Sequence, residues 1–286
     1  MLKLRSGKIF KMRYELAIVI VAVIVFLIFI IGNPKVFTKF DIYYSFMSTI
    51  PFVGILALSL TFVVVLGEMD LSFPSVVAFS AWVFGKIFML TGSVLVGGLA
   101  GLATGVIAGY LNSLMIIRIG VPSLVGTIGT QFFWRGMVNV AAQGKGISFV
   151  DAQPTVFYKV LVGRVGDTIP AQAIWMLGLG LLFWFILNRH KYGSHLLFVG
   201  DNAASSKMMG INVNRVKTIA FVQVGFFAAL VGIVSTLEVT YFWPSQGQGY
   251  MLPALAAVFV GGTSVFGGKG SIVGTFLGAI IIGSLE

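Results

Sequence analysis

The chain has no cysteine, only two histidines and few charged residues. Without cysteine, disulfide frameworks and thiolate metal sites are excluded. His190 and His195 are too few for a histidine-based metal or catalytic cluster. Charged residues make up 10% of the 286 residues, where soluble domains carry roughly 25%. This scarcity excludes a soluble enzyme, a disordered chain and a nucleic-acid-binding domain, in spite of the formal charge of +10.

Hydrophobic residues, by contrast, make up 58% of the chain, and long apolar runs dominate it. A membrane-spanning helix needs roughly 20 apolar residues. Nine segments approach that length: Tyr14–Ile31, Phe46–Leu66, Ser72–Leu90, Ser93–Ile117, Pro122–Val140, Pro170–Leu187, Thr218–Val239, Tyr250–Val265 and Ser271–Leu285. We therefore predict an all-α polytopic membrane protein, a single domain over residues 1–286, with one or two broken or re-entrant segments.

The distribution of lysine and arginine orients these segments. A basic stretch from Lys3 to Arg13 precedes the first segment, and no small-residue cleavage site follows, so the segment is expected to remain uncleaved. With the N-terminus inside, the inside loops hold 12 of the 19 basic residues and the outside loops 5. An excess of positive charge marks the cytoplasmic side. We expect a cytoplasmic N-terminus, an extracytoplasmic loop at 141–169 and a cytoplasmic loop at 189–217.

That orientation leaves Glu286 outside, directly after an apolar run. An even number of segments would return the chain to the cytoplasm. We therefore expect ten segments in the complete protein.

Glycines recur at every fourth position on the fourth segment and again near the C-terminus. Such ridges let the backbones of neighbouring helices approach closely. We predict tight helix packing at Gly97, Gly101, Gly105, Gly109, Gly270, Gly274 and Gly278.

Carboxylates interrupt the hydrophobic pattern between the second and third segments. Glu68 and Asp70 precede Ser72, which can cap the next helix, and Pro74, which suits a first helical turn. Ionisable residues within a membrane mark functional sites, and a broken helix there lines a polar path. The alternative is a solvated turn at the membrane edge.

The fifth segment is the least apolar, and it carries Gln131 and Arg135 on one helical face. Three interpretations of Arg135 are open. It lines or gates a path, it extends outward to water, or it pairs with a carboxylate such as Glu68 for structure alone. Glu238, at the end of the seventh segment, is expected to reach water. The candidate path residues are Glu68, Asp70, Ser72, Asn112, Gln131 and Arg135.

The glycine-rich stretch 260–271 does not fit a phosphate-binding loop. With Gly268 and Lys269 as its Gly-Lys pair, Thr263 stands where the first glycine belongs. Gly270 stands where a serine or threonine must bind magnesium. The chain therefore has no visible ATP site of its own, and the glycines suit a tight turn between two short helices.

A short polar helix is predicted in the cytoplasmic loop. Asp201 or Asn202 can cap it, and Gly210 can end it. Two helical turns are marginal alone, so the helix either lies on the bilayer as a plain connection or docks a soluble partner.

Four stretches together resemble the permease subunits of bacterial ABC importers for monosaccharides, of the ribose, galactose and xylose type. Residues 67–75 resemble the family's Gly-Gly-Ile-Asp-Leu-Ser-Val-Gly-Ser, with Glu68 in place of the second glycine and Phe73-Pro74 in place of Val-Gly. Residues 111–136 resemble its Leu-Asn-Gly-Leu and later Arg-Gly stretch, and residues 192–211 its coupling segment. Residues 255–283 resemble its terminal Gly-rich run, although Met251-Leu252-Pro253 precedes it where the family often has Glu-Leu.

The resemblance implies a transport subunit of the bacterial inner membrane that is not an enzyme. Its partners would be cytoplasmic ATPase subunits, which bind the ATP and magnesium, an extracytoplasmic solute-binding protein and a second permease copy. No cofactor and no nucleic acid belongs to the chain itself. The resemblance assigns ATPase coupling to Gly200, Asp201, Asn202, Ala203, Ala204, Met209, Gly210 and Ile211.

A second hypothesis is an ion-coupled secondary transporter, in which Glu68, Asp70 and Arg135 relay protons. Such a transporter would lose uptake when an uncoupler is added and keep it when ATP is depleted.

Overall fold

The computed structural model describes residues 2–166 and 168–286, with side chains from Leu16 onward. The side chains of the basic N-terminal stretch, Lys3 to Arg13, lie outside the described residues. The helices are α1 (Leu2–Gly32), α2 (Pro34–Phe37), α3 (Phe40–Val65), α4 (Phe73–Thr91), α5 (Val94–Leu114), α6 (Ser123–Ala142), α7 (Val156–Val162), α8 (Ala171–Arg189), α9 (Lys191–Asp201), α10 (Ala203–Met208), α11 (Val213–Val239), α12 (Met251–Val260) and α13 (Ile272–Leu285). A π-helical turn, Met115–Ile119, continues α5, and a 3-10 turn, Val150–Ala152, precedes α7.

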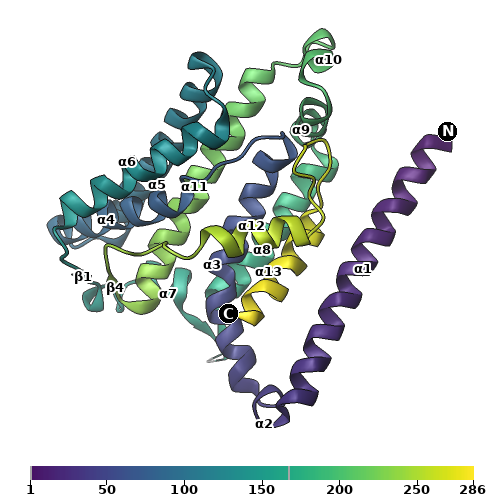
Figure 1. The fold of residues 1–286 in the computed structure, drawn as a ribbon. Coiled ribbons are helices and arrows are strands. Elements are labelled where there is room, and N and C mark those ends of the chain that lie inside the picture. The colour runs from purple at the N-terminus through teal and green to yellow at the C-terminus, as the bar shows by residue number, and fades with distance from the viewer. Residues whose placement is uncertain (1, 167) are drawn as a thin grey trace.

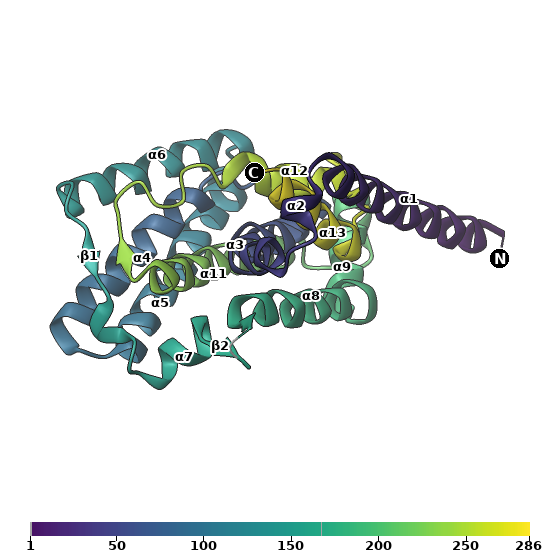
Figure 2. The same cartoon turned by 90° about the horizontal axis from the view of Figure 1, so that it is seen from below.

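The helices form two groups around a shared centre. Helices α4, α5 and α6 lie on one side, and α8, α9, α12 and α13 lie on the other (Figures 1 and 2). Between them stand α11 and α3, whose residues Ile50–Val65 are all buried. Helix α1 packs against α13, where Ile18 is buried, and its N-terminal end leads away from the body (Figure 2). Apolar segments adopt this form because a helix satisfies all its backbone hydrogen bonds internally, which lipid cannot do for it.

Each of the nine predicted segments corresponds to a helix. Within the part of the chain that the structure describes, five helices are long and apolar enough to cross a membrane: α3, α4, α5 with its π-helical turn, α8 and α11. The described part of α1 from Leu16, α12 and α13 are shorter apolar helices. The prediction Tyr250–Val265 was too long, because α12 ends at Val260 and Gly262 turns the chain with φ +82°.

Two small antiparallel ribbons accompany the helices. Strand β1 (Ile147–Ser148) pairs with β4 (Tyr241–Phe242), and β2 (Arg164–Val165) pairs with β3 (Ile169–Pro170). The first ribbon ties the 141–169 loop to the end of α11. Both ribbons lie in or against that loop, at the end of the molecule far from α10 (Figure 1).

An ion pair joins the same loop to α11. Glu238 does not simply reach water as predicted, because its Oε1 lies 2.5 Å from Nη2 of Arg164. The hydrogen bond to Glu238 raises the pKa of Arg164 above its usual value. The loop is therefore a folded cap on one end of the bundle.

Glycines on α5 stand where other helices cross it. A Cβ at Gly105 or Gly109 would collide with the Gly225 or Phe221 carbonyl of α11. Gly97 and Gly101 face the carbonyls of Phe84 and Ser80 in α4.

The same close approach occurs near the C-terminus. Gly274 and Gly278 of α13 oppose the carbonyls of Gly261 and Ala257 at α12, whereas Gly270 precedes the helix and abuts Val65. Small residues thus set the helix separations.

Candidate translocation path and coupling surface

The break between α3 and α4 is organised by one buried carboxylate. Gly67 takes φ +73°, and residues 66–72 form no helix before Phe73 begins α4. Asp70 is 1% exposed, and its Oδ1 accepts hydrogen bonds from the Ser72 amide at 2.8 Å and the Ser72 hydroxyl at 2.7 Å. The prediction that Ser72 caps α4 with its side chain was wrong. Its hydroxyl instead donates a hydrogen bond to Asp70. Pro74 does occupy the first turn of α4.

Helices α5 and α6 complete a buried polar cluster around this carboxylate. Asn112 of α5 donates from Nδ2 to the Ser72 hydroxyl at 2.7 Å and to Oδ2 of Asp70 at 3.3 Å. Thr130 of α6 donates to Oδ1 of Asn112 at 2.8 Å. Four side chains from three elements thus satisfy one another, and we call Asp70, Ser72, Asn112 and Thr130 the polar cluster. Among the described residues, no ion pair involves Asp70.

The start of α6 supplies partners to the non-helical backbone. The Met69 amide donates to the Ser123 hydroxyl at 3.1 Å, and the Leu71 amide donates to the Thr127 hydroxyl at 3.1 Å. Sequence reasoning missed Ser123, Thr127 and Thr130. Their spacing of four and then three residues places hydroxyls on one helical face, which was the available signal. These hydroxyls replace the intrahelical partners that a broken helix lacks.

Arg135 has a different partner from those predicted. Its guanidinium donates to the carbonyls of Pro244 at 2.9 Å, Gln246 at 3.2 Å and Pro74 at 3.2 Å. It therefore holds the chain between β4 and α12 against the start of α4, and it does not pair with Glu68. Gln131, one turn away on the same face, is partly exposed.

Gln246, which the sequence did not single out, anchors that connection from inside. Its side chain is buried, and Nε2 donates to the Ser235 hydroxyl at 2.7 Å and to the Gly232 carbonyl at 3.0 Å. The Thr236 hydroxyl donates to Oε1 at 3.0 Å.

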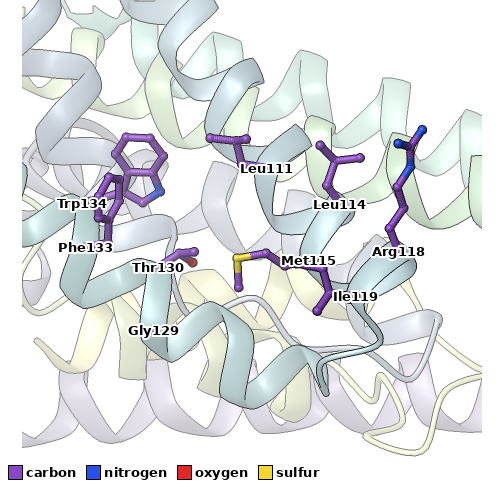
Figure 3. Close-up of a pocket in the computed structure, with 9 residues that line it drawn as sticks. All are labelled: Leu111, Leu114, Met115, Arg118, Ile119, Gly129, Thr130, Phe133 and Trp134. Atoms are coloured by element: carbon purple, nitrogen blue, oxygen red, sulfur yellow. The ribbon is translucent and has the colours of Figure 1, made fainter.

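A cavity of about 600 Å³ lies between the end of α5 and α6, beside the polar cluster. Its walls are almost entirely apolar, with Arg118 at one end and Phe133 and Trp134 at the other (Figure 3). The lining residues are Leu111, Leu114, Met115, Arg118, Ile119, Gly129, Thr130, Phe133 and Trp134. Thr130 belongs both to this wall and to the polar cluster, so the cavity touches the cluster directly.

The candidate coupling surface lies at the opposite end from the ribbons (Figure 1). The loop 189–217 is itself largely helical, since it contains α9 and α10. Asn202 caps α10 by accepting the Ser205 amide at 2.9 Å, and Gly210 ends the turn with φ +80°. Gly200 and Asp201 lie in α9, one element earlier than the short helix.

One side of the α10 region is buried against the bundle, and the apolar residues at its C-terminal end, which we call its tip, are exposed. Ser206 and Ile211 are buried, whereas Met208 is 88% exposed and Met209 67% exposed. Ala203 and Ala204 are also exposed. Below the helix, the Tyr192 hydroxyl donates to the Val216 carbonyl at 3.3 Å, and burial raises the pKa of Tyr192 well above its usual range. A small helix with an exposed apolar tip is thus fixed to the bundle.

Comparison with known proteins identifies the family. The family model described as "Branched-chain amino acid transport system / permease component" matches residues 42–286. The chain belongs to this permease family. Its relatives include the ribose import permease protein RbsC of Escherichia coli strain K12, 32% identical over 237 residues, which cover 82% of this chain and 73% of the relative.

A second relative is the autoinducer 2 import system permease protein LsrD of Salmonella typhimurium strain LT2. It is 32% identical over 285 residues, which cover 96% of this chain and 83% of the relative. The resemblance inferred from the sequence motifs is confirmed. The chain is a permease component of an ABC import system and not an enzyme, and its family implies an ATPase and a binding protein as partners.

The secondary-transporter hypothesis is not supported by this family or by the geometry. Glu68 pairs with Lys217, Asp70 with Ser72 and Asn112, and Arg135 with backbone carbonyls. The three groups therefore occupy three separate hydrogen-bond networks.

Proposed function

We propose that this chain forms the translocation path for a sugar or a sugar-like solute in an ATP-driven importer. The solute is delivered by an extracytoplasmic binding protein, and ATP is hydrolysed by cytoplasmic ATPase subunits. The similarity to import permeases over nearly the whole chain carries this proposal. The ribose and autoinducer 2 named in the two relatives are the first solutes to test.

The path runs along the polar cluster and the neighbouring cavity, at the broken segment between α3 and α4. Irregular backbone at membrane depth is tolerated where it is buried in protein, as it is around Asp70 and Ser72. The cavity reaches the polar cluster at Thr130. Two permease copies, or one copy and a paralogue, enclose the path in the bacterial inner membrane. Asp70, Ser72 and Asn112 stand closest to it, with Gln131 and Arg135 on α6.

The ATPase docks on α10. The exposed methionines supply an adaptable apolar contact, which suits insertion into a groove of the partner. Ala203, Ala204, Met209 and Gly210 form the contact, whereas Asn202 and Ile211 hold the helix in place.

The experiment is uptake into liposomes that contain the permease with its ATPase and binding protein. Radiolabelled ribose and autoinducer 2 serve as probes. Uptake should require ATP and the ATPase, and it should persist when an uncoupler collapses the proton gradient. A Met209→Asp variant should lose both ATPase docking and uptake, because a charge replaces the apolar tip. Sustained uptake by the purified chain without the ATPase would contradict the proposal.

A further inference from the structure

The short segment from Val65 to Ser72 is held at both ends by different parts of the molecule. We call it the junction segment. Its cytoplasmic end contacts α9, α11 and the loop before α13, and its inner end carries Asp70 and Ser72 of the polar cluster. Glu68 lies between the two ends, where the resembling family has glycine.

Glu68 makes the side-chain contact with the cytoplasmic elements. Its Oε1 forms an ion pair with Nζ of Lys217 in the first turns of α11. The two side chains are only 14% and 23% exposed, so water screens this pair less than a surface pair. Because α11 follows α10 after a single turn, we expect Lys217 to move with the element that we assign to ATPase docking.

Backbone contacts hold the same end closely. The Val65 carbonyl accepts the Gly268 amide at 2.8 Å, and a Cβ at Gly200 of α9 would collide with that carbonyl. A Cβ at Gly267 would come within 3.0 Å of the Gly67 Cα. These contacts leave the end of α3 little freedom to slide past α9.

The inner end is equally constrained. The Met69 and Leu71 amides are bound by α6, and Asp70 and Ser72 are bound by Asn112 of α5. Glu68 is two residues from Asp70, and two residues span at most about 7 Å. We therefore expect a displacement of Glu68 to reach the polar cluster.

We infer that the Glu68–Lys217 ion pair transmits movement of the docking helix to the broken segment of the path. Glu68 and Lys217 are positioning residues, which act through the junction segment without touching solute or ATP. The inference rests on the proposed function. Without the pair, the ATPase still docks and hydrolyses ATP, but less of its movement reaches Asp70, because only the backbone contacts of Val65 and Gly67 remain.

The test measures import and phosphate release together in liposomes with the ATPase and the binding protein. Radiolabelled ribose or autoinducer 2 is the probe, whichever the wild type imports. Glu68→Gln and Lys217→Gln should each lower the solute imported per ATP by about fivefold or more, the lower bound typical of coupling between sites. ATPase co-purification and thermal stability should stay at wild-type levels. The exchange Glu68→Lys with Lys217→Glu should restore coupling.

Glu238→Gln is the matched control, because it breaks the ion pair at the opposite end of α11. It should leave the import per ATP unchanged. Wild-type coupling in Glu68→Gln, loss of ATPase binding in that variant, or failure of the charge exchange to restore import would each overturn the inference. Failure of the wild type to import with ATP would instead contradict the proposed function.

Discussion

At the scale of single residues, Asn112 connects three parts of the candidate path. Its amide nitrogen donates to Asp70 and Ser72 in the junction segment, and its amide oxygen accepts Thr130 of α6. It is 1% exposed, so water cannot replace these partners. One side chain on α5 thus holds the broken segment and α6 in a fixed arrangement.

An Asn112→Leu substitution should destabilise the protein more than its small change in volume suggests. The substitution removes partners from buried polar groups, and each group left unsatisfied costs about 1–3 kcal/mol. We expect a clear fall in the thermal unfolding temperature in detergent and a loss of ribose or autoinducer 2 uptake. Asn139→Leu is the control, because Asn139 is exposed on α6 and such sites change stability by about 0.5 kcal/mol or less. Equal unfolding temperatures in the two variants would contradict a structural role for the cluster.

At the scale of helices, apolar length and glycine spacing predicted much of what forms. The nine segments were found from hydrophobicity, since lipid leaves a long apolar run few options other than a helix. Hydrophobicity failed where polar contacts decide the structure. It could not show that Ser72 binds Asp70 rather than the helix, or that Arg135 binds carbonyls more than 100 residues away. The partners of Arg135 are so distant in sequence that only the packing of the whole bundle brings them together.

Helix α5 offers a direct test of packing by small residues. Gly105→Ala should push α5 away from α11, because the new Cβ collides with the Gly225 carbonyl. We expect a loss of about 1–3 kcal/mol, as for overpacking in a well-packed core. Gly98→Ala is the matched control on the same helix, since nothing lies within 4 Å of its Cβ position. It should be neutral or stabilising by up to about 1 kcal/mol, because alanine favours helix. Thermal unfolding in detergent separates the two, and equal losses would contradict the packing role.

The cap of α10 offers a second test at this scale. A helix of six residues depends on its ends, and Asn202→Ala removes the hydrogen bond to the Ser205 amide. Loss of an N-cap costs about 1 kcal/mol, which corresponds to roughly fivefold weaker binding by any partner that needs the helix. We expect that decrease when purified ATPase is titrated onto the permease. Asn214→Ala, at an exposed position on α11, should bind as the wild type does. Unchanged binding by Asn202→Ala would argue against docking on α10.

At the scale of the whole molecule, the two ends differ in composition and structure. One end holds α9, α10 and the start of α11, and the other holds α7 and the two ribbons (Figure 1). The N-terminal end of α1 lies toward the α10 end (Figure 1). The basic residues Arg189, Lys191, Lys207, Arg215 and Lys217 gather at the α10 end. From the positive-inside tendency we expect that end to lie in the cytoplasm, where an ATPase can reach it.

The absence of cysteine makes this orientation testable without background labelling. Lys207→Cys on α10 and Lys159→Cys on α7 place single thiols at exposed positions on opposite ends of the molecule. A membrane-impermeant maleimide applied to intact spheroplasts should label Lys159→Cys and spare Lys207→Cys. Inverted vesicles should give the reverse pattern, and detergent should expose both sites. The opposite pattern would invert the topology and move α10 out of reach of a cytoplasmic ATPase, so this one measurement tests both the charge-based orientation and the docking assignment that depends on it.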